Sequence, residues 1–342
     1  MAYRLKVQEP VAEGVRRVGL EQIEIAEAKL ASDEDIPAAI HDARRCLKRL
    51  RALLHLVRPG LDEDAYRQEA DQLAEIGKLL SGARDRHVMQ LTLAKLEKHP
   101  GGLPKPAATR VRKVVASSNA SDGVQGNHDG RRPALSRLKQ TRKLFAGRAL
   151  GDLELDHLVE GLEVTYRKAR KAQRKAYAKP SDEAFHAWRK STQRHWRHML
   201  LLSHGWPEAL LARAGEAKEL SRLLGEDHDY SVLLAFAEEQ EKAELRRDDL
   251  ASLKAVCRAR QAELRAWAKP RGDRLFAEGE ESLKDRIALY WSSATCLSGL
   301  KAVREEKTKD QSPAPKTKAK PKRARRPRKA ARAEPDSTPQ DA

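Results

Sequence analysis

Residues 39–59 read AIHDARRCLKRLRALLHLVRP, and this stretch decides the fold class. On a helical wheel its apolar side chains gather on one side, with Leu56 as the exception: Cys46, Leu47, Leu50, Leu53, Leu54 and Val57. The opposite side is an almost unbroken ridge of basic groups: His41, Arg44, Arg45, Lys48, Arg49, Arg51 and His55. The period predicts an amphipathic helix that buries one face and presents a basic one.

A second stretch, AFHAWRKSTQRHWRHMLLLSHGWP at residues 184–207, repeats this pattern. After one more helix-length segment, related motifs follow the two stretches, KLLSGARDRHVMQL at 78–91 and RLLGEDHDYSVLLAF at 222–236. His41 and His186 are 145 residues apart, and Asp85 and Asp229 are 144 apart. The shared order and spacing predict an internal duplication, giving two similar four-helix bundles of long antiparallel helices.

Composition supports an all-α fold. Hydrophobic residues make up 40% of the chain but aromatic residues only 4%, and the strong helix formers Ala, Leu, Arg, Lys and Glu dominate. The three cysteines form no CxxC pair, so we expect no disulfide framework or structural zinc site, and a reducing compartment. The chain begins without the apolar run of a signal peptide and has no stretch apolar enough to span a bilayer. These features predict a cytoplasmic protein without membrane association.

The net charge of +18 is unevenly distributed. Residues 301–342 carry +8, which leaves +10 on residues 1–300. The composition predicts one helical domain at 1–304, with a first half at about 5–117, a Gly- and Ser-rich loop at about 117–133, and a second half at about 134–303. Residues 305–342, rich in Lys, Arg and Pro, are predicted to be a disordered basic tail.

The basic ridges require an explanation because like charges at helical spacing repel one another. In the second ridge, His186, Arg189, Lys190, Gln193, Arg194 and Arg197 share one side of the helix. One interpretation is that acids elsewhere pair with the ridges, for instance Asp62, Glu63, Glu69 or Glu216. The other is that an extended anionic ligand compensates the charge, since Arg and Lys together suit phosphate oxygens.

Further histidines and acids occur in and near the ridges. Arg84 and His228, each followed by Asp, are expected to open a helix and to face the ligand. His41 and His186 should stay largely neutral beside so many cations, whereas His195, His198 and His204 are expected at the core edge or surface. No HExxH metal motif, phosphate-binding loop or nucleophile elbow occurs, so the sequence predicts no metal site, no cofactor and no catalysis.

These motifs resemble the CHAD family, named for its histidines and α-helices. The similar pieces include LSGARDRHV, YRKARKAQRKA, LLGEDHDYSVL and GDRLFAEGEESLKDRIALYW, and they cover roughly residues 5–300. The resemblance implies two four-helix bundles with a basic surface between them, and binding of inorganic polyphosphate, sometimes at polyphosphate granules. The ligand residues it implies are His41, Arg44, Arg45, Lys48, Arg49, Arg51, Arg84, His186, Arg189, Lys190, Arg194 and His228. Gln193 and Arg197 depart from the family pattern, and Arg197 is included as the displaced cation of the second ridge.

Inorganic polyphosphate is therefore the expected partner, bound without catalysis. The alternative is a nucleic-acid-binding protein that acts non-specifically through its basic tail. Stacking of bases needs exposed aromatic side chains, and Trp188 and Trp267 are expected to be core residues, which counts against this alternative.

Overall fold

A computed structural model describes residues 3–99, 101–121, 130–147, 150, 152–240 and 245–310. Within these ranges every regular element is a helix and no strand occurs, which confirms the predicted all-α fold. The chain divides into a compact unit of residues 1–300 and a second unit of residues 301–342. Residues up to Asp310 belong to the last described helix, so the predicted tail begins inside that helix, and its remainder at 311–342 lies outside the described residues.

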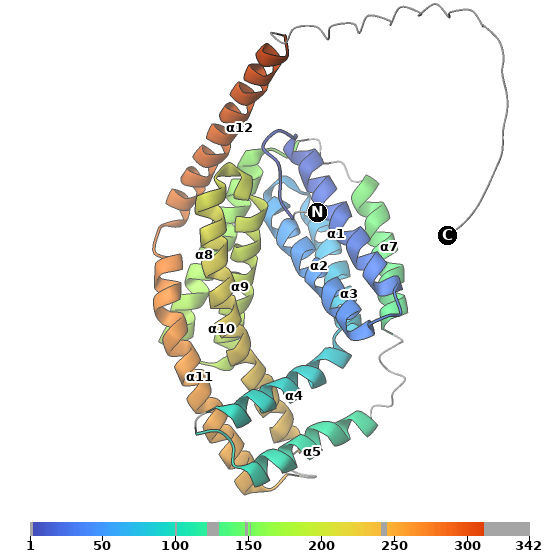
Figure 1. Cartoon of the computed structure of the whole chain (residues 1–342), viewed down its shortest axis with the longest axis vertical. Coiled ribbons are helices and arrows are strands. Elements are labelled where there is room, and N and C mark those ends of the chain that lie inside the picture. Colours follow the sequence, from blue (N-terminus) through green and yellow to red (C-terminus); the bar gives the residue numbers. More distant parts are fainter. Residues whose placement is uncertain are drawn as a thin grey trace, which may run out of the picture. The chain divides into compact units, whose positions relative to one another are not determined.

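Four helices form one bundle in the first unit (Figure 1), with bounds α1 (Val11–Ala31), α2 (Ile36–Val57), α3 (Glu63–Leu79) and α7 (Arg131–Gly147). The start of α2 is set by Asp35, whose side chain accepts a hydrogen bond from the Ala38 amide, and by Pro37 in the first turn. Asp62 caps α3 in the same way. In α2 the predicted apolar face is confirmed as buried, and Leu56 is buried with it.

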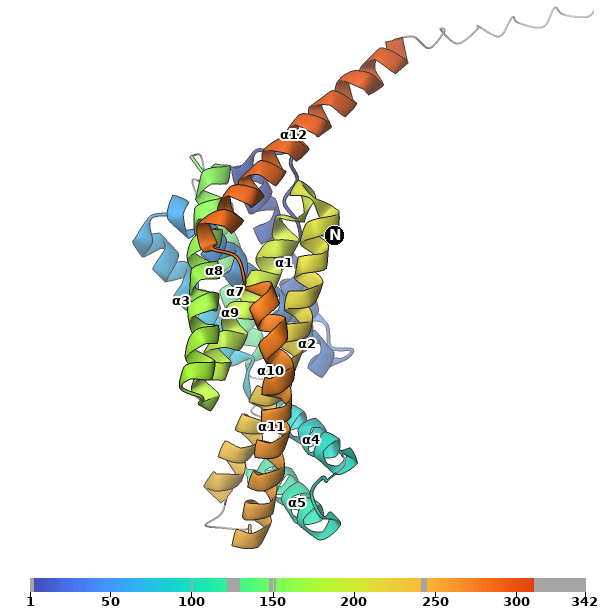
Figure 2. The ribbon, with the colours of Figure 1, turned by 90° about the vertical axis from the view of Figure 1, so that its left-hand side faces the viewer.

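Helix α7 belongs in sequence to the predicted second half, yet it packs against α1 and α3 of the first. Conversely, α4 (Gly82–Lys98) contacts α10 and α5 (Lys105–Ser121) contacts α11, away from the bundle that precedes them in the chain (Figure 2). Helices α5 and α7 also extend into the predicted loop at 117–133, of which residues 122–129 lie outside the described part. The internal duplication stays a prediction.

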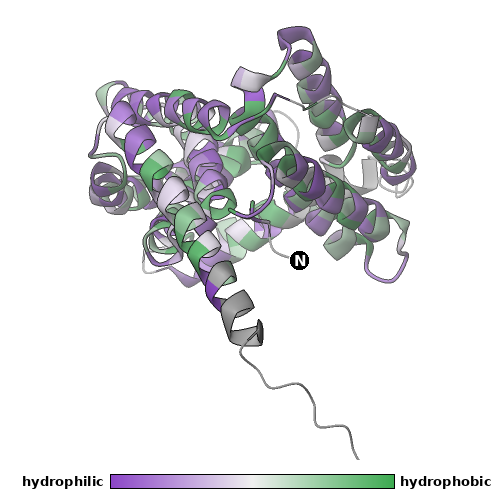
Figure 3. Cartoon of the chain, turned by 90° about the horizontal axis from the view of Figure 1, so that it is seen from above, coloured by the Kyte–Doolittle hydropathy of each residue, from purple (hydrophilic) through white to green (hydrophobic). Residues whose placement is uncertain are grey.

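Five helices follow in the chain, with bounds α8 (Leu155–Ala178), α9 (Asp182–Leu201), α10 (Pro207–Gln240), α11 (Arg247–Leu275) and α12 (Glu280–Asp310). Helix α10 packs against both α9 and α11, and α8 packs against α9 (Figures 1 and 2). Figure 3 shows hydrophilic and hydrophobic residues interspersed along the helices of the chain. Trp188 is fully buried as predicted, but the prediction for Trp267 is wrong, since it is 66% exposed.

His228 does not open a helix as predicted, because α10 runs unbroken from Pro207 to Gln240. Gly225 lies inside this helix rather than before it. A single helical glycine costs only about 1 kcal/mol relative to alanine, and the packing of α10 against α9 and α11 outweighs that cost. The corresponding prediction for Arg84 is confirmed for the backbone, since α4 begins at Gly82.

The bundle of α1, α2, α3 and α7 meets the later set of helices, α8 to α12, where α2 packs against α8 and α9. Gly161 of α8 allows the close approach, because a Cβ there would overlap the carbonyl oxygen of Leu56. His198 of α9 lies in the same junction, with Nε2 2.9 Å from the Ala52 carbonyl and Nδ1 3.1 Å from the Thr165 hydroxyl. The expectation that His195 and His198 lie at the core edge or surface is wrong, since both are buried.

Candidate functional site

A basic cleft lies between α2, α4, α9 and α10, and most of the predicted ligand residues line it. It consists of two adjoining cavities of about 440 and 420 Å³. Five residues line both cavities and so make them continuous: Lys48, Arg189, Gln193, Arg197 and Asp229. The first cavity adds Arg44, Arg51, His55, His186, Lys190, Arg194 and His228, and the second adds His41, Arg45, Lys95, Lys218, Arg222 and Glu226.

Arg194 is held in the cleft by a histidine of the other ridge. Its Nη2 donates to Nε2 of His55 at 3.0 Å, and the Tyr66 hydroxyl lies 2.8 Å from Nδ1 of the same ring. Because a guanidinium only donates, Nε2 must carry the lone pair and Nδ1 the proton. Burial, followed by the charge of Arg194, lowers the pKa of His55 to about 3, so this ring stays neutral. The contact joins α9 to α2 and fixes the Arg194 guanidinium.

Arg197 is a buried cation that lines both cavities. It is 7% exposed, donates to the Gln193 carbonyl at 2.7 Å and lies over the Trp196 ring at 4.9 Å. Burial lowers its pKa to about 10, which still leaves it charged at neutral pH. Within the described part of the chain, no carboxylate lies within 4 Å of the basic groups of Arg51, Lys190, Arg194, Arg197 or Lys218.

The α2 side of the cleft is more exposed and partly committed to other contacts. Nη1 of Arg44 donates to the carbonyls of Gly77 at 3.2 Å and Leu80 at 2.8 Å, which satisfies the end of α3. Arg45 pairs with Asp42 at 2.9 Å. Arg45 and Arg51 are exposed, so their charges are better hydrated than those of Arg194 and Arg197.

Two histidines stack at the wall of the first cavity. The ring centroids of His186 and His228 are 3.9 Å apart, with the planes inclined at 32°. Burial and then the charges of Lys190 and Arg189 lower the pKa of His186 to about 4. Burial and then His186 lower the pKa of His228 to about 3. Both rings are neutral at pH 7, which agrees with the expectation for His186, and within the described part of the chain the buried Nδ1 of His186 has no hydrogen-bond partner.

Three of the four acids that sequence analysis considered as partners of the ridges make contacts outside them. Asp62 caps α3, Glu63 pairs with Arg58 and Arg67, and Glu216 pairs with two arginines of α11. The acids that line the cleft are Glu226, which bridges Lys95 and Arg222, and Asp229. The cleft therefore keeps a large excess of basic groups among the described residues that line it.

Two predicted ligand residues are not seen to line the cleft. Arg49 turns toward α1, where its Nη1 donates to Gln22 at 3.0 Å and its guanidinium lies 5.3 Å from the Tyr3 ring centroid. The side chain of Arg84 lies outside the described part. Lys95, Lys218 and Arg222 line the cleft and were not predicted. Lys218 and Arg222 share a face of α10 with Asp229, and that spacing is the signal that could have found them.

No three His, Cys, Asp or Glu side chains of the described residues are grouped so that they could hold a metal ion. Over the same residues, no helix combines the length and apolar character needed to cross a membrane.

The protein is thus an all-α protein with a basic cleft between α2 and α4 on one side and α9 and α10 on the other. The sequence profile of the CHAD domain matches residues 17–238, and the chain belongs to this family. The crystal structure of the CHAD domain from the plant Ricinus communis is similar to this chain, with 18% identity and a TM-score of 0.53. The match covers 77% of this chain and 90% of the plant domain, and shows a shared fold. No curated protein matches the chain.

Proposed function

We propose that the basic cleft binds inorganic polyphosphate and does so without catalysis. The observation that carries the proposal is the cluster of Arg51, Lys190, Arg194, Arg197 and Lys218, which line the cleft with no carboxylate within 4 Å among the described residues. Basic groups that face one cleft from three helices repel one another, and a linear polyanion relieves this repulsion at every repeat. Guanidinium groups also match phosphate oxygens in geometry.

A flexible inorganic chain suits the cleft better than a duplex. Trp196 supplies an indole to the second cavity, and the Arg197 guanidinium already covers this ring. Polyphosphate has no bases to accommodate and a charge on every repeat. Family membership agrees with this choice, since the CHAD resemblance implies polyphosphate binding. On this proposal the protein accumulates where polyphosphate does, including polyphosphate granules.

The test is a competition titration with long-chain polyphosphate, duplex DNA and single-stranded RNA at about 150 mM salt. Three proteins are compared: the intact chain, a chain ending at Asp310, and the double variant Arg51→Glu with Lys190→Glu. Both reversed residues are exposed and have no ion pair among the described residues, so the fold should tolerate them. We expect the shortened chain to keep most of its polyphosphate affinity and the double variant to lose at least about 100-fold.

The matched control is Lys171→Glu with Arg174→Glu on α8, which makes the same change in net charge away from the cleft. It should weaken polyphosphate binding only a few-fold through long-range electrostatics. Equal affinity for all three polymers, lost with residues 311–342, would instead identify the tail as the binder. Shortening of the polymer during incubation would contradict binding without catalysis.

A further inference from the structure

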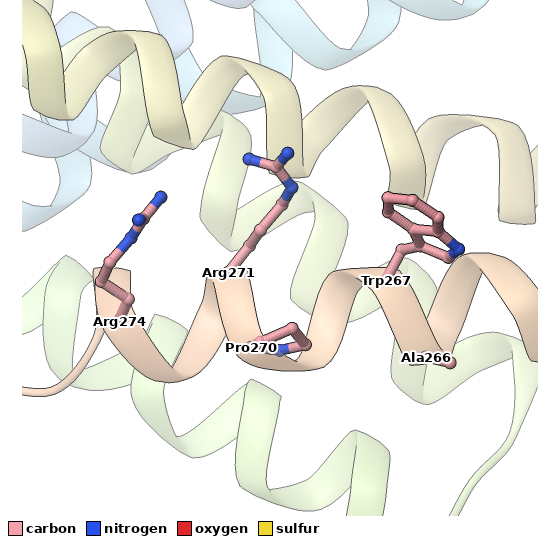
Figure 4. Close-up of a pocket in the computed structure, with 5 residues that line it drawn as sticks. All are labelled: Ala266, Trp267, Pro270, Arg271 and Arg274. Atoms are coloured by element: carbon pink, nitrogen blue, oxygen red, sulfur yellow. The ribbon is translucent and has the colours of Figure 1, made fainter.

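A second basic site lies on α11, with an exposed indole as its largest feature. Trp267, Arg271 and Arg274 project from the same side of this helix toward α10 (Figure 4). With Ala266 and Pro270 they line a hollow of about 470 Å³. We call Trp267, Arg271 and Arg274 the Trp267 face. None of its residues lines the basic cleft, so it is separate from the site of the proposed function.

The indole is unusual for its exposure. Trp267 is 66% exposed in a chain with only 4% aromatic residues, whereas Trp188 is fully buried. An exposed indole offers a flat surface on which a planar ring can stack. Since the helix rises 1.5 Å per residue, Arg271 stands about 6 Å and Arg274 about 10.5 Å further along the axis. The face therefore combines a stacking surface with two cations on one side of it.

Both arginines already converge on a single anion. Nη1 of Arg271 lies 2.8 Å from Oε1 of Glu216, and Nη2 of Arg274 lies 2.8 Å from Oε2 of the same carboxylate. Two guanidinium groups that hold the two oxygens of one group suit a phosphodiester, which also presents two unesterified oxygens. Glu216 of α10 thus occupies the position that a phosphate would take, and a ligand phosphate must displace it.

Pro270 adds an acceptor to the same hollow. It lies inside α11 and has no amide proton, so the Ala266 carbonyl cannot receive the usual helical bond from residue 270. Ala266 lines the hollow beside Trp267. The hollow thus combines a stacking surface, a backbone acceptor for an exocyclic amine, and donors for a phosphate.

We propose that the Trp267 face binds single-stranded nucleic acid, with one base stacked on Trp267 and the adjacent phosphate held by Arg271 and Arg274. Single strands are favoured over duplexes because stacking on an indole needs an unpaired base. A basic peptide is disfavoured as the ligand, because the two arginines would repel it. Sequence analysis counted against nucleic acid the expectation that Trp267 is a core residue, and the exposure of Trp267 removes that objection.

The test uses the full chain and two probes of equal charge, a fluorescent oligo-deoxyadenylate of about ten nucleotides and an abasic strand of the same length. Attraction by the basic tail and the cleft is the same for both probes, so the affinity ratio isolates stacking. We expect the wild-type protein to prefer the adenine strand by about 5- to 30-fold. Trp267→Ala should reduce this ratio to about 1, and Trp267→Phe should retain part of it.

Two sets of variants separate the parts of the site. The double variant Arg271→Gln with Arg274→Gln should bind both probes more weakly, and its affinity should depend less on salt concentration. Some preference for the adenine strand should remain. Glu216→Gln should raise the affinity for both probes by about threefold, because it removes the carboxylate that competes with the ligand phosphate. Trp206→Ala is the matched control, since Trp206 is 48% exposed but packs edge-on against Tyr290 rather than beside two arginines.

An unchanged ratio in Trp267→Ala would overturn the proposal. So would a Trp267-dependent affinity for an acidic peptide without any preference for the adenine strand, which would make the face a protein-binding surface. Polyphosphate affinity should be the same in Trp267→Ala as in the wild-type protein. Failure of the cleft to bind polyphosphate and failure of the Trp267 face to bind bases are therefore distinguishable.

Discussion

The two basic helices of the cleft, α2 and α9, have the same sequence pattern but hold their charges in different environments. On α2, His41, Arg45 and Arg51 are exposed to water. On α9, Arg197 is buried and burial lowers the pKa of Arg194. Burial weakens competition from water, so Arg194 and Arg197 on α9 should contribute more to anion binding than Arg45 and Arg51 on α2.

The difference arises from what each helix packs against. α9 lies between α8, α10 and α2, whereas α2 leaves more of its ridge uncovered. Arg49 and Arg194 occupy matching positions, since each lies eight residues after the first histidine of its stretch. Arg49 contacts Gln22 and Tyr3, whereas Arg194 bonds His55 inside the cleft. Equal positions on a helical wheel therefore make different contacts, which depend on the neighbouring helices.

The largest expected effect concerns stability, in a comparison of a buried histidine of α9 with an exposed one of α2. His198→Ala should lower the free energy of unfolding by about 3 kcal/mol, because it removes two buried hydrogen bonds and leaves a cavity. His41→Ala should change it by less than about 0.5 kcal/mol. Urea unfolding followed by circular dichroism measures both, and similar losses would contradict the assigned difference between the helices.

The second prediction sets function against stability at Arg197. Arg197→Met should lower polyphosphate affinity by about 30-fold, because a buried charged donor is lost from both cavities. The same change should leave the free energy of unfolding unchanged or raise it by about 1 kcal/mol, since an apolar side chain replaces a buried unpaired charge. Arg45→Met on α2 should weaken binding by no more than about threefold. A large loss of stability in Arg197→Met would show that the cation is compensated within the fold.

The third prediction compares the matched arginines directly. Arg194→Gln should weaken polyphosphate binding by about tenfold, because it removes a fixed charge from the cleft. Arg49→Gln should weaken it by less than about twofold, since its side chain contacts Gln22 and Tyr3 instead. Titration calorimetry with long-chain polyphosphate distinguishes the two. Equal losses would mean that only the net charge matters, and would remove the distinction between the helices.

The sequence was sufficient for those features that periodicity determines. The buried and basic faces of α2 follow from a repeat of 3.6 residues, and both agree with the burial of Leu47 and Leu50 and the exposure of Arg45. Periodicity identifies a face but not the element that covers it, so Arg49 was assigned to the ligand together with Arg194. The prediction that a helix starts near His228 is wrong for a related reason. A glycine ends a helix only where packing does not support the helix.

Tertiary packing accounts for what the sequence could not provide. α4 reaches the cleft by packing against α10, and it contributes Lys95 to the second cavity. Lys218 and Arg222 contribute because α10 turns that face toward α2 and α9. The contact between α4 and α10 joins segments more than a hundred residues apart, and neither propensity nor local pattern encodes it. The exposure of Trp267 likewise depends on which side of α11 remains uncovered.

The smallest expected effect is a pH dependence of binding that belongs to α9 and α10 alone. Burial is the main cause that lowers the pKa of His186 to about 4 and of His228 to about 3, below the ordinary value of 6.5. Between about pH 7.5 and 5.5 both rings are thus neutral in the free protein. A bound polyanion favours the protonated ring and raises its pKa, so the complex takes up protons as the pH falls.

Polyphosphate affinity should therefore rise by about threefold from pH 7.5 to 5.5, and His186→Gln with His228→Gln should flatten the profile. Stability runs in the opposite direction. A histidine whose folded-state pKa is lowered contributes stability that is complete above pH 6.5 and is lost as the pH falls toward its folded pKa. Unfolding measured at each pH separates the two effects, because partial unfolding would weaken binding in acid. An affinity that falls at pH 5.5 while the fold remains intact would exclude protonation of the stacked pair on binding.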